Sequence, residues 1–522
     1  MLRYSLLDEA LVRYRRVGDG EMVHVSLPEL FVALAANEVR DFPALRSHQR
    51  HPWYAFLCQL AAITLHHADR NDLFATAEEW KAALLALTPN DPDGAAWCLI
   101  TPPERPAFLQ APVPKRTVSN WKTVCRAADE LDMLVTSRNH DLKAARARRA
   151  TTDEWLYALL SIQTQEGFLG QGNYGISRMN GGFSSRPGIG IVEGSSWGGR
   201  WYWDTRLLLN AREHIADTHD LPIIGGHALL WLLPWDGNQS LQFSSLDPLY
   251  IEICRRVRLQ CDGAGLFAMC SGTRAARVAA KDLNGVTGDP WTPVETTAGK
   301  ALSLTGEGFH YKLLSELLFG GKFTPGVAHS VNGRGSPLYL IARAVARGQG
   351  KTEGYHERQI PISPRMRSWM QQQQHAMLAK IAHERIAAIA EVRSLLWQSL
   401  VVLFNNGDIG KDASDSVKDK AKRFSKSFEQ GEDGRFFIDL TEEVESDTPE
   451  NVRLHWMLGV VDRADAILRA AFDAGPRSAM RRYHACAAAL SRFHGALRRT
   501  KSPLPLLAQH YQNRTNQEDV NV

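Results

Sequence analysis

The sequence has few cysteines, and none of them sits at the spacing of a zinc site. Seven cysteines are scattered along the chain without a CxxC pair: Cys58, Cys98, Cys125, Cys254, Cys261, Cys270 and Cys486. An odd, scattered set of this kind fits a reducing compartment and excludes a disulfide-rich fold. It also offers no ligand spacing for zinc, so we predict no bound metal.

Long apolar runs are missing as well. The most apolar stretches, such as Ala228–Leu233, are far shorter than the roughly 20 residues that a membrane-spanning helix requires. The start of the chain carries Asp8 and Glu9, too early for the apolar stretch of a signal peptide. We therefore expect a cytoplasmic protein.

A large excess of charge is also absent. The chain has 61 Lys and Arg against 57 Asp and Glu, a net charge of +4, which is too small to indicate a nucleic-acid partner by itself. Two segments are nevertheless locally basic, namely 139–149 and 474–502. Such clusters favour phosphate contacts through counterion release, although a solvated helix face is the alternative reading.

The chain changes character near residue 358. Up to that point it is rich in Gly and Pro, with one clear helical pattern beginning at Pro52. Beyond it, four amphipathic patterns at 367–404, 411–430, 448–474 and 477–500 favour a helical bundle. We predict an α+β protein with a large, mixed and irregular N-terminal domain over 1–358, a linker at 359–364, a C-terminal four-helix bundle over 365–510 and a disordered tail at 511–522.

Two glycine-rich segments imitate nucleotide-binding motifs. Gly170–Gly175 matches GxGxxG, but a helix is expected before it where a dinucleotide site needs a strand. The segment 348–352 reads GQGKT, but Val345 stands where a P-loop needs glycine, and we predict a helix over 338–346. With no GxSxG or HExxH motif, we predict no catalytic residues and no cofactor. A nucleotide-dependent enzyme that uses these loops is the alternative.

Glycine-rich polar loops have a second use beside DNA. Because glycine lacks a Cβ atom, its backbone can approach a groove closely, and a neighbouring Asn or Gln can meet a base edge. The narrow minor groove suits such slim elements. The segments 167–175 and 347–354 both fit this description.

A series of ordered motifs points to one family. They are Leu6–Glu9, Ser26–Leu30, the helix Phe56–Ala68, Ala95–Leu99, Arg105–Gln110, Leu134–Asp141, Gln165–Gly170, Arg178–Phe183 and Gly288–Val294. In this order the motifs resemble the CasA-type large subunit of the type I-E CRISPR Cascade, an RNA-guided antiviral surveillance complex. The resemblance covers nearly the whole chain.

The resemblance implies a non-catalytic DNA-recognition subunit. Such a subunit contacts the 5′ handle of the guide RNA and recognises the protospacer-adjacent motif (PAM) in double-stranded DNA from the minor groove. It then begins strand separation for R-loop formation and helps recruit a helicase–nuclease. The implied partners are the guide RNA, the target DNA, the helicase–nuclease, and the backbone, small and handle-binding subunits of Cascade.

The resemblance also assigns site residues. The family's glycine loop falls on Gly170, Gln171, Gly172 and Asn173, and its wedge segment on Gly348, Gln349, Gly350 and Lys351. Its lysine finger falls on Lys281, with Arg277 as the competitor. The loop that joins the guide handle to the PAM region, here the basic loop, carries Asn139, His140, Lys143, Arg146, Arg148 and Arg149. The bundle's basic helix face carries Arg481, Arg482, Arg492, Arg498 and Arg499.

Overall fold

The computed structural model describes residues 2–132, 150–194, 196–348, 351–408, 413–498 and 504–520. The chain forms two compact units. The N-terminal unit comprises 1–309 and 321–361, and the helical unit comprises 310–320 and 362–522. The α+β class predicted from the sequence is confirmed.

The core of the N-terminal unit surrounds one helix, α2 (Arg50–His67). Its residues from His51 to Leu65 are all buried. The sequence pattern indicated an apolar face, whereas the structure buries the helix on every side, as expected of a helix that is apolar all round. Six fully buried tryptophans belong to the same unit: Trp53, Trp80, Trp97, Trp155, Trp201 and Trp231.

Three of the other helices of this unit, α1 (Leu27–Ala35), α3 (Ala77–Ala86) and α6 (Thr152–Thr164), begin at capping boxes. Ser26 with Glu29, Thr76 with Glu79, and Thr151 with Glu154 form capping boxes, in which side chains satisfy backbone N–H groups at the helix start. Helices α4 (Ala128–Asp132) and α7 (Trp197–His219) belong to the same unit.

Small sheets complete the N-terminal unit. Three have three strands each: β3–β2–β4 (Met22–Val25, Val12–Arg16, Val39–Asp41), β11–β12–β6 (Arg256–Asp262, Gly265–Ser271, Thr123–Cys125) and β15–β14–β16 (Lys300–Ala301, Val294–Glu295, Phe323–Thr324). Three are strand pairs: β1–β5 (Arg3–Ser5, Cys98–Ile100), β10–β8 (Leu246–Ile251, His227–Leu229) and β13–β9 (Val278–Ala279, Leu241–Gln242).

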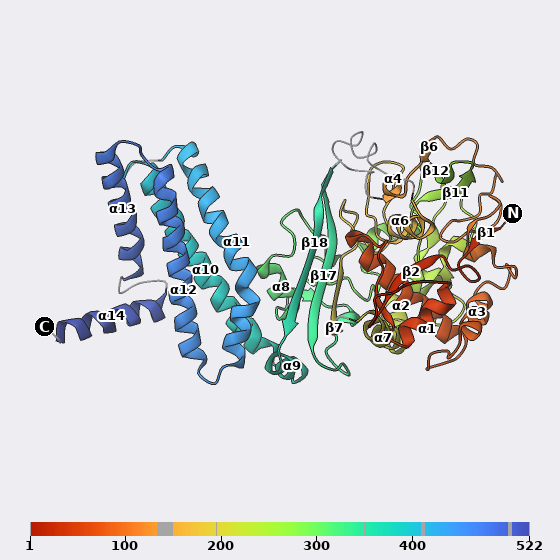
Figure 1. The fold of residues 1–522 in the computed structure, drawn as a ribbon, viewed down its shortest axis with the longest axis horizontal. Helices are drawn as coiled ribbons and strands as arrows, with labels where there is room; N and C mark the ends of the chain where they lie inside the picture. The colour runs from red at the N-terminus through yellow and green to blue at the C-terminus, as the bar shows by residue number, and fades with distance from the viewer. Residues whose placement is uncertain are drawn as a thin grey trace. The chain divides into compact units, whose positions relative to one another are not determined.

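The longest sheet, β18–β17–β7, corrects one prediction. It consists of β7 (Gly188–Glu193), β17 (Leu338–Gly348) and β18 (Lys351–Ile362), and Figure 1 shows β17 and β18 as a long hairpin. We predicted a helix over 338–346, which is wrong. The alanine-rich segment suits a helix, but β17 lies between two strands, and this pairing overrides the local propensity.

The helical unit contains four long helices side by side, α10 (His375–Phe404), α11 (Asp415–Glu445), α12 (Pro449–Ala470) and α13 (Ala479–Leu497) (Figure 1). Helix α10 is long and apolar enough to pass a composition test for a membrane span. It packs against the other three, however, so it is the core helix of the bundle. The short helices α8 (Tyr311–Leu318) and α9 (Pro364–Gln371) also contact α10 and α11.

Buried ion pairs tie the bundle together. Arg385 of α10 lies 2.8 Å from Glu443 of α11, and both side chains are 1% exposed. Arg453 of α12 contacts the same carboxylate, and Arg463 of α12 lies 2.6 Å from Glu432 of α11. These contacts explain why α11 continues to Glu445, beyond the helix that we predicted to end at 430.

The predicted ends of the bundle also differ from the structure. Residues 359–362, predicted as part of a linker, are the last residues of β18. Ser363 then caps α9 directly, because its side chain accepts a hydrogen bond from the backbone of Met366. The predicted disordered tail at 511–522 overlaps helix α14 (Pro505–Val520), whose first turn is anchored by the buried Leu507.

Candidate nucleic-acid interface

The glycine loop is a tight turn in the N-terminal unit. The backbone N–H of Asn173 donates to the carbonyl of Gly170 at 2.9 Å, and that of Leu169 donates to the carbonyl of Asn173 at 3.0 Å. The side chains of Gln171 and Asn173 are exposed. The turn therefore presents two polar side chains to solvent on a closed backbone frame.

Glycine is required at this turn for two different reasons. Gly170 and Gly172 have φ values of +110° and +86°, which side-chain-bearing residues rarely adopt. At Gly175, an added Cβ atom would lie 2.6 Å from the backbone carbon of Gly167. The first pair shapes the turn, and Gly175 lets the two ends of the loop meet.

The loop is fixed to the β11–β12 region by buried contacts. The backbone N–H of Thr273 donates to the carbonyl of Gly172 at 2.9 Å. The guanidinium of Arg255, a buried residue, donates to the carbonyl of Tyr174 and, at 3.1 Å, to that of Gly167. The glycine loop is thus held at its tip and at both of its ends.

The wedge segment lies where the two longest strands join. Gly348 ends β17 and Lys351 begins β18, while Gln349 and Gly350 lie outside the described residues. The side chain of Lys351 is 41% exposed and forms an ion pair of 2.8 Å with Glu353. Strand β17 pairs with β7 only from Leu338 to Arg343, so the half of the hairpin next to the wedge segment extends past β7.

One buried arginine connects three of the predicted elements. Arg347, next to the wedge segment, donates to Glu166 at 2.6 Å, and both side chains are 1% exposed. Glu166 directly precedes the segment 167–175, and its carbonyl accepts the N–H of Ile176 at 3.0 Å. Arg347 also contacts the carbonyl of Asp132 at 3.5 Å, where the described chain stops before the basic loop. Nothing in the sequence predicts this junction.

The two lysine-finger candidates have opposite environments. Lys281 is exposed at the start of a short 3-10 helix, Lys281–Leu283. Arg277 is 2% exposed and donates to the carbonyls of Leu230 and Leu233 at 2.8 and 2.9 Å. Burial lowers the pKa of Arg277 to about 10. Its two terminal nitrogens already donate to carbonyls inside the protein, so Lys281 is the better candidate.

The basic loop lies outside the described residues. Its predicted contacts Asn139, His140, Lys143, Arg146, Arg148 and Arg149 all fall within 133–149. Arg499, the last member of the basic helix face, lies outside them too. These residues remain sequence predictions.

The other members of the basic helix face are on α13 or directly after it. Arg481, Arg482 and Arg498 are exposed, whereas Arg492 is partly buried and donates to Gln398 at 2.6 Å. Arg482 forms an ion pair of 2.6 Å with Asp473. Exposed Met480 and Tyr483 lie among these cations, so this surface is less purely ionic than its sequence implies.

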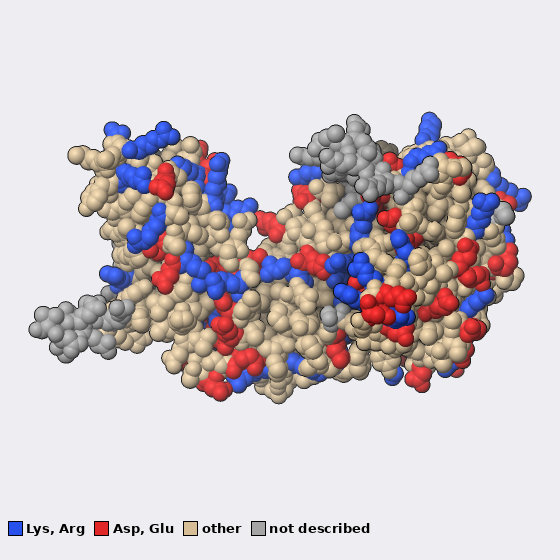
Figure 2. Space-filling view, viewed as in Figure 1, with Lys and Arg blue, Asp and Glu red and all other residues tan. Residues whose placement is uncertain are grey.

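A second basic segment, which we did not predict from the sequence, lies beside this one. The first half of α11 carries Lys418, Lys420, Lys422, Arg423 and Lys426, which our prediction treated only as part of a helix. Lys420 donates to the carbonyl of Ala474, close to the start of α13. Figure 2 shows Lys and Arg gathered over this end of the helical unit. The repeated Lys and Arg residues over 418–426 could have indicated this basic segment from the sequence alone.

The structure removes the support for the nucleotide-enzyme alternative. Helix α6 precedes the glycine loop and turns follow it, and the GQGKT segment lies at a hairpin. Neither therefore has the strand–loop–helix context of a phosphate-binding loop. Among the described residues, no group of three His, Cys, Asp or Glu side chains is arranged to hold a metal ion.

Solved structures share this fold over almost the whole chain. CasA (Cse1) from Thermus thermophilus is 16% identical, with a TM-score of 0.59 over 98% of this chain and 100% of that one. Cse1 from Acidimicrobium ferrooxidans is 15% identical, with a TM-score of 0.62 over 98% of both chains. Cse1 from Thermobifida fusca is 14% identical, with a TM-score of 0.62 over 94% and 97%.

Comparisons of the sequence, by contrast, found no relative. No protein-family model matches the chain, and no curated protein matches it in sequence. At these identities the structural likeness concerns the fold. The chain has the fold of the CRISPR-associated CasA (Cse1) proteins.

Proposed function

We propose that this chain is the large subunit of an RNA-guided Cascade complex that recognises the PAM of double-stranded DNA and begins to separate its strands. The observation that carries the proposal is the buried contact between Arg347 and Glu166. It joins the wedge segment and the glycine loop to one rigid support, as a reader of a short DNA motif requires. The fold shared with CasA over 98% of this chain agrees with this role.

The exposed polar groups fit contacts with the minor groove. Gln171 and Asn173 can donate to the acceptors that every base pair presents there. Lys281 supplies a cation, which the negative potential of a narrow minor groove attracts. Gln349 then enters the base stack beside the motif, at a cost of a few kcal/mol per step that the opened duplex must repay.

The rest of the proposed role concerns partners. The basic loop contacts the 5′ handle of the guide RNA, and the basic end of the bundle, where α11 and α13 begin, contacts the DNA strands. The other Cascade subunits hold the chain in the complex, and a helicase–nuclease is recruited after R-loop formation. In this proposal the chain acts in the cytoplasm and carries no catalytic site, because base pairing reads the long sequence and separate subunits cut.

Replacing the wedge glutamine tests the proposal. In the assembled complex with its guide RNA, we expect Gln349→Ala to slow R-loop formation on a linear target duplex by about tenfold, because strand opening loses its stabilising contact. A target with a pre-opened bubble beside the PAM should restore the rate. The measurement is the time course of R-loop formation for a panel of flanking trinucleotides.

A matched control separates the wedge from general damage. Gln242→Ala removes an exposed glutamine from the short strand β9 of the same unit, and it should open the duplex at the wild-type rate. If Gln349→Ala also opened the closed duplex at that rate, the wedge assignment would be wrong. If the wild-type complex opened all flanking trinucleotides equally, the proposal of PAM recognition would fail.

A further inference from the structure

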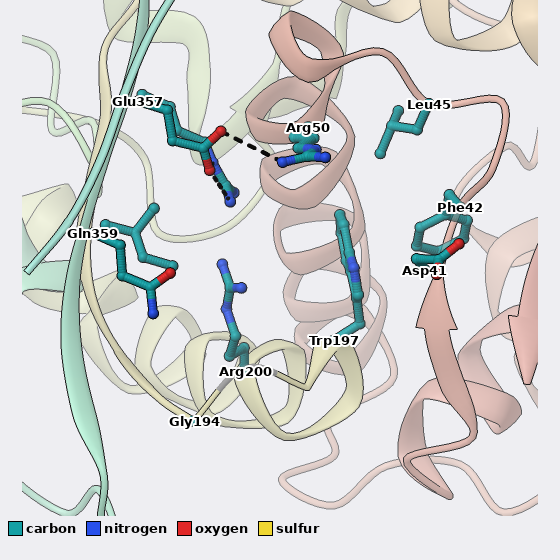
Figure 3. A pocket seen from close by; sticks show the side chains of 11 residues that line it. Asp41, Phe42, Leu45, Arg50, Gly194, Trp197, Arg200, Glu357 and Gln359 are labelled. Carbon is teal, nitrogen blue, oxygen red and sulfur yellow. Dashed lines mark hydrogen bonds and ion pairs between the residues drawn. The ribbon is translucent and has the colours of Figure 1, made fainter. Parts of the chain in front are cut away.

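A pocket that none of the predicted interface residues lines lies in the N-terminal unit. It has a volume of about 250 Å³ and lies between the segment from β4 to the start of α2, the first turn of α7, and strands β17 and β18 (Figure 3). Its walls bring together three guanidinium groups, from Arg50, Arg200 and Arg343. Three cations around one small cavity repel one another unless negative charges lie close to them.

Two of the three arginines share one carboxylate. Glu357 of β18 lies 2.7 Å from Arg343 and 3.4 Å from Arg50. The hydroxyl of Tyr355 also donates to Glu357, at 2.9 Å. The other acid in the wall, Asp41, has partners in Arg15 at 3.4 Å and Arg40 at 3.7 Å.

Among the described residues Arg200 has no ion-pair partner, although its guanidinium carbon lies 5.3 Å from the centroid of the Tyr54 ring. It is 8% exposed, and Figure 3 shows its guanidinium pointing into the cavity. Among the residues that the structure describes, none accepts a hydrogen bond from this guanidinium, and its Nε atom is fully buried. The nearby Asp204 is bound by Arg334 at 2.5 Å and by the hydroxyl of Tyr54 at 2.7 Å.

An unpaired buried cation is unfavourable unless a ligand neutralises it. Burial lowers the pKa of Arg200, but an arginine keeps its charge at neutral pH. A hydrophobic side chain of similar size would fill this place at less cost. The position of Arg200 therefore indicates an anionic partner.

The other walls of the pocket narrow the class of ligand. Helix α7 begins at Trp197, so the positive end of a 23-residue helix lies beside Arg200 and favours an oxyanion. Phe42 packs its ring against Trp197 at 4.8 Å and an interplanar angle of 84°. Figure 3 shows the Trp197 ring between Phe42 and Arg200, where it offers an aromatic wall. The amide of Gln359 supplies a neutral polar group.

We propose that this pocket binds a phosphate-bearing ligand of up to about the size of one nucleotide. The phosphate lies against Arg200, Arg50 and the start of α7, and a planar group lies against Trp197. A volume of 250 Å³ is just below the roughly 300 Å³ at which pockets for drug-sized ligands begin. The same chemistry belongs to a free mononucleotide and to the phosphorylated end of a nucleic-acid strand.

Calorimetry on the full-length chain tests the proposal. The probes are inorganic phosphate, adenosine 5′-monophosphate, and adenosine as the uncharged analogue. We expect the monophosphate to bind and adenosine to bind at least about tenfold more weakly, because the charge-assisted hydrogen bonds are lost. Each ligand is titrated into the millimolar range, about ten times the protein concentration that a calorimetric signal needs. If neither phosphate nor the monophosphate bound there, the proposal would be wrong.

Three variants locate the binding site. Arg200→Gln should weaken monophosphate binding by about tenfold or more, and Arg50→Gln by about threefold, since Arg50 is also paired with Glu357. Arg206→Gln removes an arginine from the same helix outside the pocket and should bind like the wild type. Equal affinity in Arg200→Gln and Arg206→Gln would place any binding elsewhere. Arg50 is 43% exposed in its side chain, so its variant keeps the test valid if Arg200→Gln does not fold.

Competition distinguishes the two sources of the phosphate. A short oligonucleotide with a 5′-phosphate and the same strand with a 5′-hydroxyl are added to the monophosphate complex. Displacement by the phosphorylated strand alone identifies a strand end as the ligand. Displacement by neither strand identifies the free mononucleotide, whereas equal displacement by both would contradict a site for a terminal phosphate.

Discussion

At the scale of single residues, His51 links stability to pH. It lies 5% exposed in the first turn of α2, with its ring 5.6 Å from that of Trp291. Burial lowers its pKa well below the ordinary value, and the positive charges of Arg186 and Arg343 lower it further while Asp289 opposes them. The folded protein therefore holds this imidazole neutral.

The consequence is a loss of stability on mild acidification. The unfolded chain takes up the proton at a pKa near 6.5 and the folded chain does not, so stability is full above that pH and falls below it. We expect up to about 1.4 kcal/mol per pH unit from this group between pH 6.5 and 5.5. Urea unfolding at each pH measures it.

A pair of variants isolates the contribution of His51. His51→Gln should reduce the pH dependence of the unfolding free energy over this range and leave the share of other buried histidines, such as His329, whose pKa burial lowers to about 4. His227→Gln, at an exposed histidine of β8, should keep the wild-type slope. An identical slope in the wild type and in His51→Gln would show that the buried imidazole does not control this transition.

Accessibility is the residue property that the sequence could not predict. Lys281 and Arg277 are equivalent candidates by charge and position in the sequence, yet one is exposed and the other is surrounded by backbone carbonyls. Arg347 and Arg255 carried no signal at all, although they hold the glycine loop and the hairpin in place. Buried arginines of this kind depend on partners that are distant in the chain.

At the scale of elements, the pair Arg347–Glu166 should determine how firmly the hairpin and the glycine loop are joined. Removing one partner of a fully buried ion pair leaves an uncompensated charge, which typically costs about 3 kcal/mol or more. We therefore expect Glu166→Gln to lower the free energy of unfolding by about 3 kcal/mol. Chemical denaturation of the full-length chain measures it.

A surface pair in the same hairpin provides the comparison. Glu353→Gln removes the carboxylate that pairs with Lys351, whose side chain is 41% exposed, and exposed pairs contribute at most about 1 kcal/mol. If both variants lost the same stability, the buried pair would not be the stronger connection. A shorter hydrogen-exchange lifetime around residues 167–175 in Glu166→Gln alone would locate the effect at the loop.

Helices with a strong local sequence pattern could be predicted, whereas strands that depend on pairing with distant parts of the chain could not. The apolar segment Trp155–Leu160, with the acids Asp153 and Glu154 in its first turn, predicted helix α6. The bundle helices followed from their amphipathic period, although α11 extends to Glu445 because of partners on α10 and α12. The local sequence of β17 favours a helix, because nothing in it shows the two strands that pair with it.

At the scale of the whole molecule, the chain consists of two units that each bury a core of their own. Such units commonly unfold as separate cooperative transitions. We expect two transitions in calorimetry, and Leu396→Ala should lower only one of them. Leu396 is fully buried in α10, and truncating a leucine in a packed core costs about 3 kcal/mol.

A matched truncation assigns the other transition. Leu60→Ala removes a fully buried leucine from α2 and should lower the transition that Leu396→Ala leaves unchanged. A single transition shifted by either variant would mean that the two units unfold as one.

The net charge of the whole molecule did not indicate its basic segments, whereas the order of the motifs did indicate its fold. The net charge of +4 hides basic segments at the starts of α11 and α13, next to an acidic second half of α11. The ordered motifs anticipated the fold shared with CasA through their resemblance to that family, and some of them also support the glycine loop. Asp289 of Gly288–Val294, for example, binds Arg186 at 2.5 Å, and the backbone of Arg186 binds that of Gln165.

The contact between Arg347 and Glu166 also restricts the length of the hairpin β17–β18. Each strand advances about 3.3 Å per residue and its side chains alternate between two faces. Between Arg347 and the part of β17 that pairs with β7, the hairpin can therefore lengthen without turning Arg347 away from Glu166 only in steps of two residues per strand, or about 7 Å. Residues added between Arg347 and the end of the hairpin leave the contact with Glu166 in place, so the position of Arg347 separates a part of the hairpin with discrete allowed lengths from an end that can vary freely.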